Sequence, residues 1–292
     1  MNRRELMFSL PAATLSSLSI PAVAATGNKA LLKPAICAYS FREALKAKAM
    51  TYEDLIRLTA DLGAEGMDMT VYWFPDTSDQ FLNSVRRTAY KSCVSIYSIA
   101  IRSVMTQPTP ELRVKEAEEV KKWVDVAVRL GAGHIRVFGG TVPKGATDDQ
   151  AVDWVVEVLQ RSSEYAASKG VILGLEDHGG ITARAETVLK IVRKVNSPWV
   201  GVNLDTGNFS IDPYKEIEIC LPNAANVQLK TLIRDETGKR IPSDWDRILK
   251  MLAQAGYRGY LALEYEDKEA PETAVPRLIA KLRQLTAKYS AV

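Results

Sequence analysis

Two apolar runs, VILGLE at 171–176 and VGVNLD at 200–205, decide how the fold of this chain is read. Each run is continuous enough to be buried on both faces, as strands of a parallel sheet are, and each ends on a carboxylate. Two later runs, AANVQLK at 224–230 and YLALEYE at 260–266, also carry an amide or a carboxylate near their ends. Polar side chains that recur where buried strands end are typical of a barrel of parallel strands.

The same pattern extends toward the beginning of the chain. Further strand candidates are AICAYS (35–40), AEGMDMT (64–70), VSIYSIAI (94–101) and HIRVFG (134–139). Between the runs lie amphipathic stretches that predict helices, often with glycine at the helix exit. Eight strand–helix units predict an α/β fold, a single-domain (β/α)₈ TIM barrel over residues 33–288. No G-x-G-x-x-G follows the first strand, which disfavours a dinucleotide-binding sheet.

The first 25 residues are a different kind of sequence. Arg3 and Arg4 precede an apolar stretch that ends in the small-residue pattern Ala22-Val23-Ala24. This order predicts a secretory signal peptide at 1–25, and the paired arginines resemble a twin-arginine signal. We therefore expect a periplasmic or extracellular protein with no stable membrane insertion after the signal is removed. An N-terminal amphipathic helix or an uncleaved membrane anchor is the alternative.

Charge and cysteine content narrow the classes of partner. The 292 residues include 38 basic and 35 acidic side chains, and the formal charge is +3. This balance shows no basic stripe, so we expect a small-molecule substrate and no nucleic acid. The three cysteines, Cys37, Cys93 and Cys220, form no C-x-x-C motif. We expect no disulfide, and we place Cys37 and Cys93 inside strands as small apolar side chains.

Four residues, Glu176, Asp205, Gln228 and Glu264, come from the last four predicted strands. In a parallel barrel the carboxyl ends of all strands face one opening, so these side chains should converge there. Three carboxylates on one rim repel each other unless a cation is present. Ligands that are all oxygen suit Mg²⁺ or Mn²⁺, with Co²⁺ tolerated, better than Zn²⁺. Alternatively, some of these carboxylates cap a helix or pair with a lysine or arginine of the rim.

The ordered motifs GLEDH, NLDTGN, VQLK and LEYE resemble the sugar phosphate isomerase/epimerase family, which has the xylose isomerase-like TIM barrel. The resemblance covers the chain from about residue 33 to residue 285. It implies a divalent ion, commonly Mn²⁺, Mg²⁺ or Co²⁺, held by Glu, Asp, His and Glu of the last four strands. Glu176, Asp205 and Glu264 match, and Gln228 stands where histidine is usual. An amide oxygen can bind a hard cation, and 3-dehydroshikimate dehydratases that resemble this family also carry glutamine there.

Side chains around the same opening are candidates for binding substrate. The resemblance implies that Arg234, six residues past Gln228, binds substrate. Asn208, three residues past Asp205, stands where epimerases often have a substrate-binding histidine. Aromatic rings stack on the C–H faces of sugars, and arginines hold substrate oxygens. His134 begins its strand at the far end from the opening, and we expect it to be structural. The predicted substrate-binding residues are His178, Asn208, Lys230, Arg234, Tyr39, Trp73 and Arg102, with Arg136 a further candidate.

Together these groups predict proton transfer beside a carbonyl. A divalent ion lowers the cost of an enediolate, while Glu176 and Glu264 pass a proton as base and acid. We therefore expect a metal-dependent isomerase or epimerase that acts on a sugar or keto-sugar. A lyase or dehydratase on a 3-keto-glycoside or dehydroshikimate-like substrate is one alternative, and a non-catalytic sugar-binding barrel is another. A homo-oligomer is compatible with either role.

Overall fold

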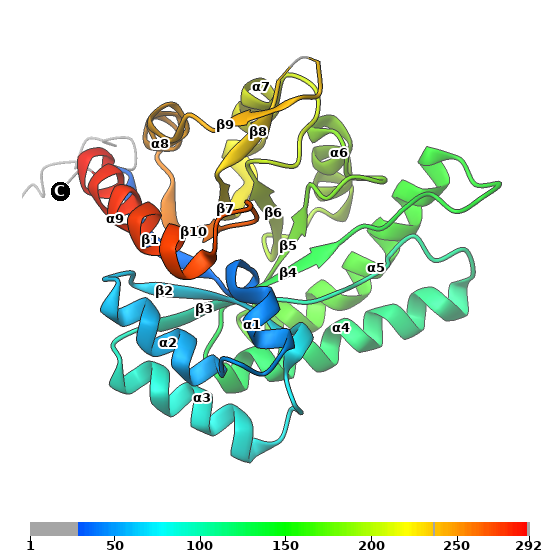
Figure 1. Ribbon diagram of the computed structural model, residues 1–292. Helices are drawn as coiled ribbons and strands as arrows, with labels where there is room; N and C mark the ends of the chain where they lie inside the picture. Colours follow the sequence, from blue (N-terminus) through cyan, green and yellow to red (C-terminus); the bar gives the residue numbers. More distant parts are fainter. Residues whose placement is uncertain (1–28, 236, 291–292) are drawn as a thin grey trace, which may run out of the picture.

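The computed structural model describes residues 29–235 and 237–290. Within them, parallel strands close into a barrel that α-helices surround (Figure 1). The strand order around the barrel is β1-β10-β7-β6-β5-β4-β3-β2. The predicted (β/α)₈ TIM barrel is therefore confirmed. The predicted signal peptide, residues 1–25, lies outside the described residues.

The barrel strands alternate with the helices along the chain. The strands of the barrel are β1 (Leu31–Cys37), β2 (Gly66–Thr70), β3 (Ser95–Ala100), β4 (His134–Phe138), β5 (Ile172–Glu176), β6 (Val200–Asp205), β7 (Ala224–Lys230) and β10 (Arg258–Glu264). The helices are α1 (Arg42–Lys46), α2 (Tyr52–Asp61), α3 (Asp79–Lys91), α4 (Pro110–Leu130), α5 (Asp148–Ser168), α6 (Ala185–Val195), α7 (Pro213–Cys220), α8 (Trp245–Gln254) and α9 (Pro271–Tyr289). Short 3₁₀ turns are η1 (Ala38–Phe41), η2 (Val71–Trp73) and η3 (Leu221–Asn223).

Local sequence signals explain where several helices begin and end. The Thr51 side chain accepts from the backbone N–H of Asp54, whose carboxylate in turn accepts from the backbone N–H of Thr51, and this capping box starts α2. Thr147 and Gln150 start α5 in the same way. Helix α4 ends at Leu130 and is capped by Gly131, whose φ of 84° lies in the left-handed region that glycine adopts without strain.

Two strands are shifted from their predicted ranges, and one hairpin was not predicted. Strand β1 ends at Cys37 because residues 38–41 turn into η1, so the predicted strand at 35–40 was wrong at both ends. Strand β10 likewise begins and ends two residues earlier than the predicted run at 260–266. After β7, β8 (Leu232–Arg234) and β9 (Arg240–Pro242) form an antiparallel hairpin. Strands of three residues are too short to show a hydrophobic period.

The cysteines are free, as expected, but one of them is not where the sequence placed it. Cys37 and Cys220 are buried, whereas Cys93 is exposed. Cys93 lies in the turn before β3 with a φ of 55°, so its predicted place inside a strand was wrong. A residue in the left-handed region cannot continue a β-strand.

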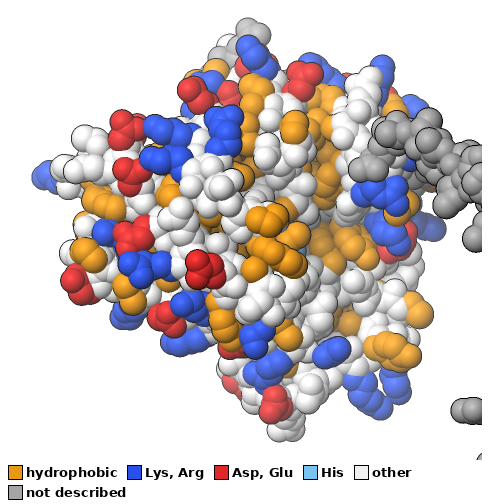
Figure 2. Space-filling view, turned by 180° about the vertical axis from the view of Figure 1, so that it is seen from behind, with side chains coloured by type: hydrophobic (Ala, Val, Ile, Leu, Met, Phe, Trp, Pro, Cys, Tyr) orange, Lys and Arg blue, Asp and Glu red, His pale blue; other side chains and the backbone are white. Residues whose placement is uncertain are grey.

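The surface of the described part of the chain fits the balanced charge of the sequence. On the face seen in Figure 2, basic and acidic side chains are interspersed, with apolar side chains between them. Such a face offers no continuous basic track for a nucleic acid. Over residues 29–235 and 237–290, none of the helices combines the length and the apolar character that crossing a bilayer requires.

A pair of stacked tyrosines fills the amino-terminal end of the barrel. The rings of Tyr97 on β3 and Tyr260 on β10 lie 4.0 Å apart at an interplanar angle of 12°. Both rings pack against a small buried cluster formed by Ala35, Cys37 and Ala262. The rings fit because β2 carries glycine at this level: a Cβ added to Gly66 would lie 2.6 Å from the Tyr260 ring.

Candidate active site at the carboxyl end of the barrel

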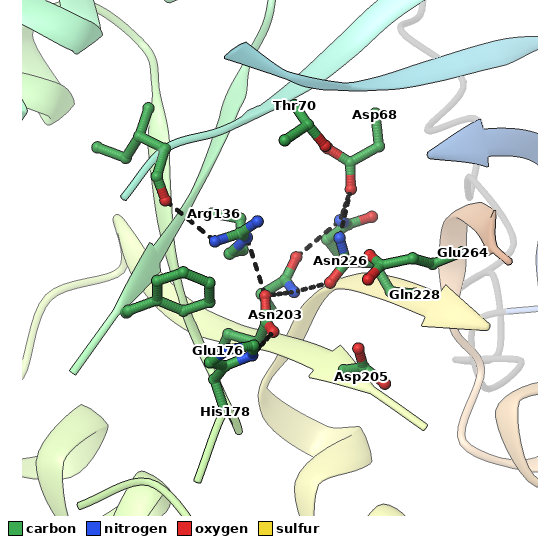
Figure 3. Close-up of polar contacts among 12 residues, drawn as sticks. Asp68, Thr70, Arg136, Glu176, His178, Asn203, Asp205, Asn226, Gln228 and Glu264 are labelled. Carbon is green, nitrogen blue, oxygen red and sulfur yellow. Dashed lines mark hydrogen bonds and ion pairs between the residues drawn. The ribbon is translucent and has the colours of Figure 1, made fainter. Parts of the chain in front are cut away.

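Four neighbouring strands bring the predicted polar residues to one end of the barrel. Glu176, Asp205 and Glu264 are the last residues of β5, β6 and β10, and Gln228 lies near the end of β7. Asp205 is the register partner of Gln228, so the two lie at the same height. Figure 3 shows these side chains facing a common interior region. All four side chains are buried.

Arg136 on β4 compensates the charge of Glu176. The Arg136 Nε lies 2.9 Å from Glu176 Oε2, and both side chains are 4% exposed. Arg136 also donates to the hydroxyl of Tyr72 and to the carbonyl oxygen of Ile101, so its position is fixed. The other oxygen of Glu176 lies 2.8 Å from His178 Nδ1. Burial lowers the pKa of His178, but the hydrogen bond to Glu176 and the negative charges of Glu176 and Asp205 together outweigh this effect, and the pKa is raised.

Lys230, the last residue of β7, is the second cation of the site. Its Nζ lies 2.6 Å from Glu264 Oε1 and 3.3 Å from Asp205 Oδ2, and it also contacts the carboxylate of Glu266. Burial raises the pKa of Asp205 to about 7, although Lys230 opposes the shift. For Glu264 burial acts in the same direction, but Lys230 outweighs it and holds the pKa below its usual value. Glu264 is therefore ionised at neutral pH.

A buried network of amides connects Gln228 to the rest of the site (Figure 3). The Asn203 Nδ2 donates to Gln228 Oε1 at 2.7 Å and to Glu176 Oε2 at 3.3 Å. The Gln228 Nε2 donates to Asp68 Oδ2 at 3.1 Å. Asn226 donates to both Asp68 and Asn203, and all members of this network are buried. Since an ionised carboxylate only accepts hydrogen bonds, Asp68 orients the amide of Gln228.

The donor atoms of the site fit a hard divalent cation in kind and in charge. Asp205 Oδ2 is buried and has no hydrogen-bond partner among the described residues, and the other predicted ligands offer oxygen. However, Arg136 and Lys230 already lie against Glu176, Glu264 and Asp205. In residues 29–235 and 237–290 no three His, Cys, Asp or Glu side chains are grouped closely enough to hold a metal ion. The predicted metal ligands therefore stay a prediction.

A cavity of about 560 Å³ opens above these residues. It brings together five of the predicted substrate-binding residues: Tyr39, Arg102, His178, Asn208 and Lys230. Trp73 does not line it but packs against Tyr39, with ring centroids 5.9 Å apart. Arg234 lines a smaller cavity, which shares Lys230 and Arg240 with the large one, and it donates to the Gly238 carbonyl oxygen of its own hairpin. The hairpin instead places Arg240 on the wall of the large cavity.

Several residues of the site were not predicted from the sequence, although the positions of some of them in the predicted strands could have indicated their role. Asn203 lies two residues before Asp205, so it faces the same side of β6. Asp68 is a charged residue inside a fully buried strand. His134, which was predicted to be structural, is the first residue of β4 and so lies at the end of the strand far from the cavity. It is buried, and its Nδ1 lies 2.8 Å from Ser98 Oγ on β3. Arg240 carries no such signal, because its hairpin was not predicted.

Comparison with known proteins identifies relatives of this barrel. A protein of Haemophilus influenzae, named as an L-ribulose-5-phosphate 3-epimerase, is 24% identical over 255 residues, which cover 77% of this chain and 87% of that protein. The crystal structure of an Escherichia coli 3-keto-D-glucoside 4-epimerase matches with a TM-score of 0.69 at 14% identity, covering 87% of this chain and 99% of that one.

A Mycobacterium smegmatis xylose isomerase-like TIM barrel protein, solved in complex with magnesium, also matches. Its TM-score is 0.69 at 18% identity, and the match covers 89% of this chain and 98% of that one. At such identities the structural matches establish the fold. The sequence itself matches the xylose isomerase-like TIM barrel family from residue 56 to residue 285. This chain therefore belongs to the xylose isomerase-like TIM barrel family.

Proposed function

We propose that this protein is an isomerase or epimerase that moves a proton on a sugar or keto-sugar. One observation carries the proposal: two buried carboxylates, Glu176 and Glu264, end strands β5 and β10, each beside a fixed cationic side chain. Strands β6 and β7 lie between them in the barrel, so the two acids reach the cavity from different directions. Proteins similar to this chain in sequence or in fold include some named as sugar epimerases, which also supports the proposal.

The two carboxylates differ in the titratable side chains beside them: Lys230 at Glu264 and His178 at Glu176. Lys230 holds the pKa of Glu264 low, so this carboxylate is ionised and able to remove a proton from carbon. Glu176 is hydrogen-bonded to His178 Nδ1, and the raised pKa of His178 makes the ring a local source of protons. We therefore assign Glu264 as the base that starts the reaction, and Glu176 with His178 as the acid that completes it.

We further propose that Glu176, Asp205, Gln228 and Glu264 hold a divalent ion, Mn²⁺ or Mg²⁺, with Co²⁺ as a substitute. The oxygen-only donor set supports this proposal, as does Asp205 Oδ2, a buried atom with an ion pair to Lys230 but no hydrogen bond among the described residues. The magnesium complex of the structurally similar Mycobacterium smegmatis protein also supports it. When bound, such an ion supplies positive charge for the oxyanion of an enediolate. Lys230 competes with the ion for Asp205 and Glu264, so affinity for the metal should rise when Lys230 is replaced by methionine.

Solvent deuterium exchange tests the reaction class directly. The purified protein is incubated in D₂O with Mn²⁺ and a panel of sugars and keto-sugars, and incorporation at carbon is followed by NMR. We expect deuterium in substrate and in an epimer or isomer, and loss of both with Glu264→Gln. Glu164→Gln, an exposed change on α5, is the matched control. An unsaturated product without an epimer would identify a lyase or dehydratase, and no exchange with any compound would refute the enolisation.

Export is a separate proposal that rests on residues 1–25. We propose that the twin-arginine-like segment directs the protein to the periplasm or beyond, and that cleavage follows the Ala22-Val23-Ala24 pattern. N-terminal sequencing of the protein recovered from cell fractions would check both points. Recovery of the full-length chain from the cytoplasmic fraction would contradict them. Substitution of Arg3 and Arg4 by lysine should block export if the signal is of the twin-arginine type.

A further inference from the structure

Two arginines stand on opposite walls of the large cavity. Arg102 follows β3, and Arg240 lies on the hairpin that follows β7. In the closed barrel, β3 and β7 are separated by three strands on either side, so they face each other across the opening. Both side chains are exposed to solvent within the cavity rather than buried in its wall. The cavity is therefore lined by an arginine on each of two facing sides.

The other charges of the cavity are matched by ion pairs, whereas these two arginines form none with the residues that the structure describes. Arg136 is paired with Glu176, and Lys230 is paired with Glu264 and Glu266. The ion pairs among residues 29–235 and 237–290 include neither Arg102 nor Arg240. Within the same hairpin, Asp235 Oδ1 accepts from the backbone N–H groups of Thr237 and Lys239.

Arg102 is also held in place. Its guanidinium carbon lies 4.2 Å from the centroid of the Tyr72 ring, a cation–π contact. The hydroxyl of the same tyrosine accepts a hydrogen bond from Arg136, the partner of Glu176. Arg102 is thus positioned relative to the proposed proton-transfer residues, while the N–H groups of its fork are left for a ligand. A guanidinium fork binds a carboxylate or a phosphate by two parallel hydrogen bonds.

We propose that Arg102 and Arg240 bind an anionic group of the substrate, so that the preferred substrate is an acidic sugar or its keto derivative rather than a neutral one. A carboxylate and a phosphate share the required chemistry, and the experiment below separates them. The inference rests on the proposed function for the reaction, but it concerns binding alone. Its failure can therefore be told apart from failure of the proton-transfer proposal.

Calorimetric titration with matched acidic and neutral probes tests the inference. The probes are D-glucuronate against D-glucuronamide, and D-glucose 6-phosphate against D-glucose, in EDTA so that no divalent ion attracts the anion. We expect at least one anionic probe to bind about tenfold or more tightly than its neutral partner. The probe with the larger preference identifies carboxylate or phosphate as the group that is bound. The preference should weaken as salt is added.

Variants of the two arginines complete the test. Arg102→Met and Arg240→Met should each lower the affinity for the preferred anion about tenfold while leaving that of the neutral probe unchanged. Arg87→Met, on the exposed face of α3, is the matched control and should bind as the wild type does. Both site variants replace exposed side chains, and circular dichroism verifies that they fold. Equal affinity for acidic and neutral probes, no binding of either anion, or wild-type affinity in both variants would overturn the proposal.

Discussion

Replacing Arg136 by methionine should destabilise the protein far more than removing a surface charge. Arg136 and Glu176 are each 4% exposed and lie 2.9 Å apart, so the variant leaves Glu176 as a buried carboxylate without its cation. Removing one partner of a buried pair costs about 3–5 kcal/mol. His178 and Asn203 still contact Glu176, so we expect the lower end, about 3 kcal/mol. For a domain of this size that loss corresponds to a fall in Tm of about 6–12 °C.

A double variant tests whether the uncompensated charge is the cause. In Arg136→Met/Glu176→Gln the buried charge is removed, and we expect about half of the lost stability to return. Full recovery is not expected, because Arg136 also bonds Tyr72 and Ile101. Unfolding in urea is followed by circular dichroism in EDTA, since a bound divalent ion would compensate the same charge.

The control for this experiment is an ion pair of similar length at the surface. Lys33 and Glu65 lie 2.7 Å apart, with side chains 37% and 50% exposed. Lys33→Met should cost no more than about 1 kcal/mol. Two results would refute this explanation: Arg136→Met loses no more free energy of unfolding than this control, or the double variant is as unstable as the single one. In either case an uncompensated buried charge on Glu176 does not cause the loss.

Three further predictions concern stability. Burial lowers the pKa of His134 to about 3, against about 6.5 in the unfolded chain. The contribution of neutral His134 to the free energy of unfolding should therefore be fully present above pH 6.5 and fall below that pH by up to about 1.4 kcal/mol per pH unit. Urea unfolding at several pH values should show a shallower fall in His134→Gln. Asp68→Leu leaves the Gln228 amide without its acceptor and should cost about 1–3 kcal/mol, whereas Asp68→Asn keeps an acceptor and should cost less; equal losses in thermal unfolding would contradict this. Gly66→Ala should overpack the tyrosine stack and cost about 1–3 kcal/mol, while Gly133→Ala, with open space around it, should unfold at nearly the wild-type temperature.

The part of the site that follows from strand position could be predicted from the sequence. Buried strands have a strong hydrophobic signal, and a carboxylate at the end of such a strand marks the opening of the barrel. Glu176, Asp205 and Glu264 are accordingly the last residues of their strands. The alternative that rim cations pair with these carboxylates was also open from the sequence, and the described ion pairs of Arg136 and Lys230 are of this kind.

Other features depend on contacts that the sequence does not encode locally. The partners of Asp68 lie on β7, 158 and 160 residues away in the chain. Which residues of a hairpin line a cavity depends on the alternation and twist of very short strands, so the place of Arg240 on the wall of the large cavity was not predicted. Strand ends also shift when a 3₁₀ turn competes with the last residues of a strand, as η1 does after Cys37.

The stacked tyrosines have a consequence for the kinetics of the proposed enzyme. Tyr97 and Tyr260 close the amino-terminal end of the barrel, so the cavity at the carboxyl end serves as both entrance and exit. Product must leave by this route before another substrate molecule can enter. Since substrate and product of a one-substrate enzyme compete for this same cavity, we expect competitive product inhibition, and Arg240 of the hairpin lies on the cavity wall. Changes at this hairpin should therefore alter the release of product and the capture of substrate together.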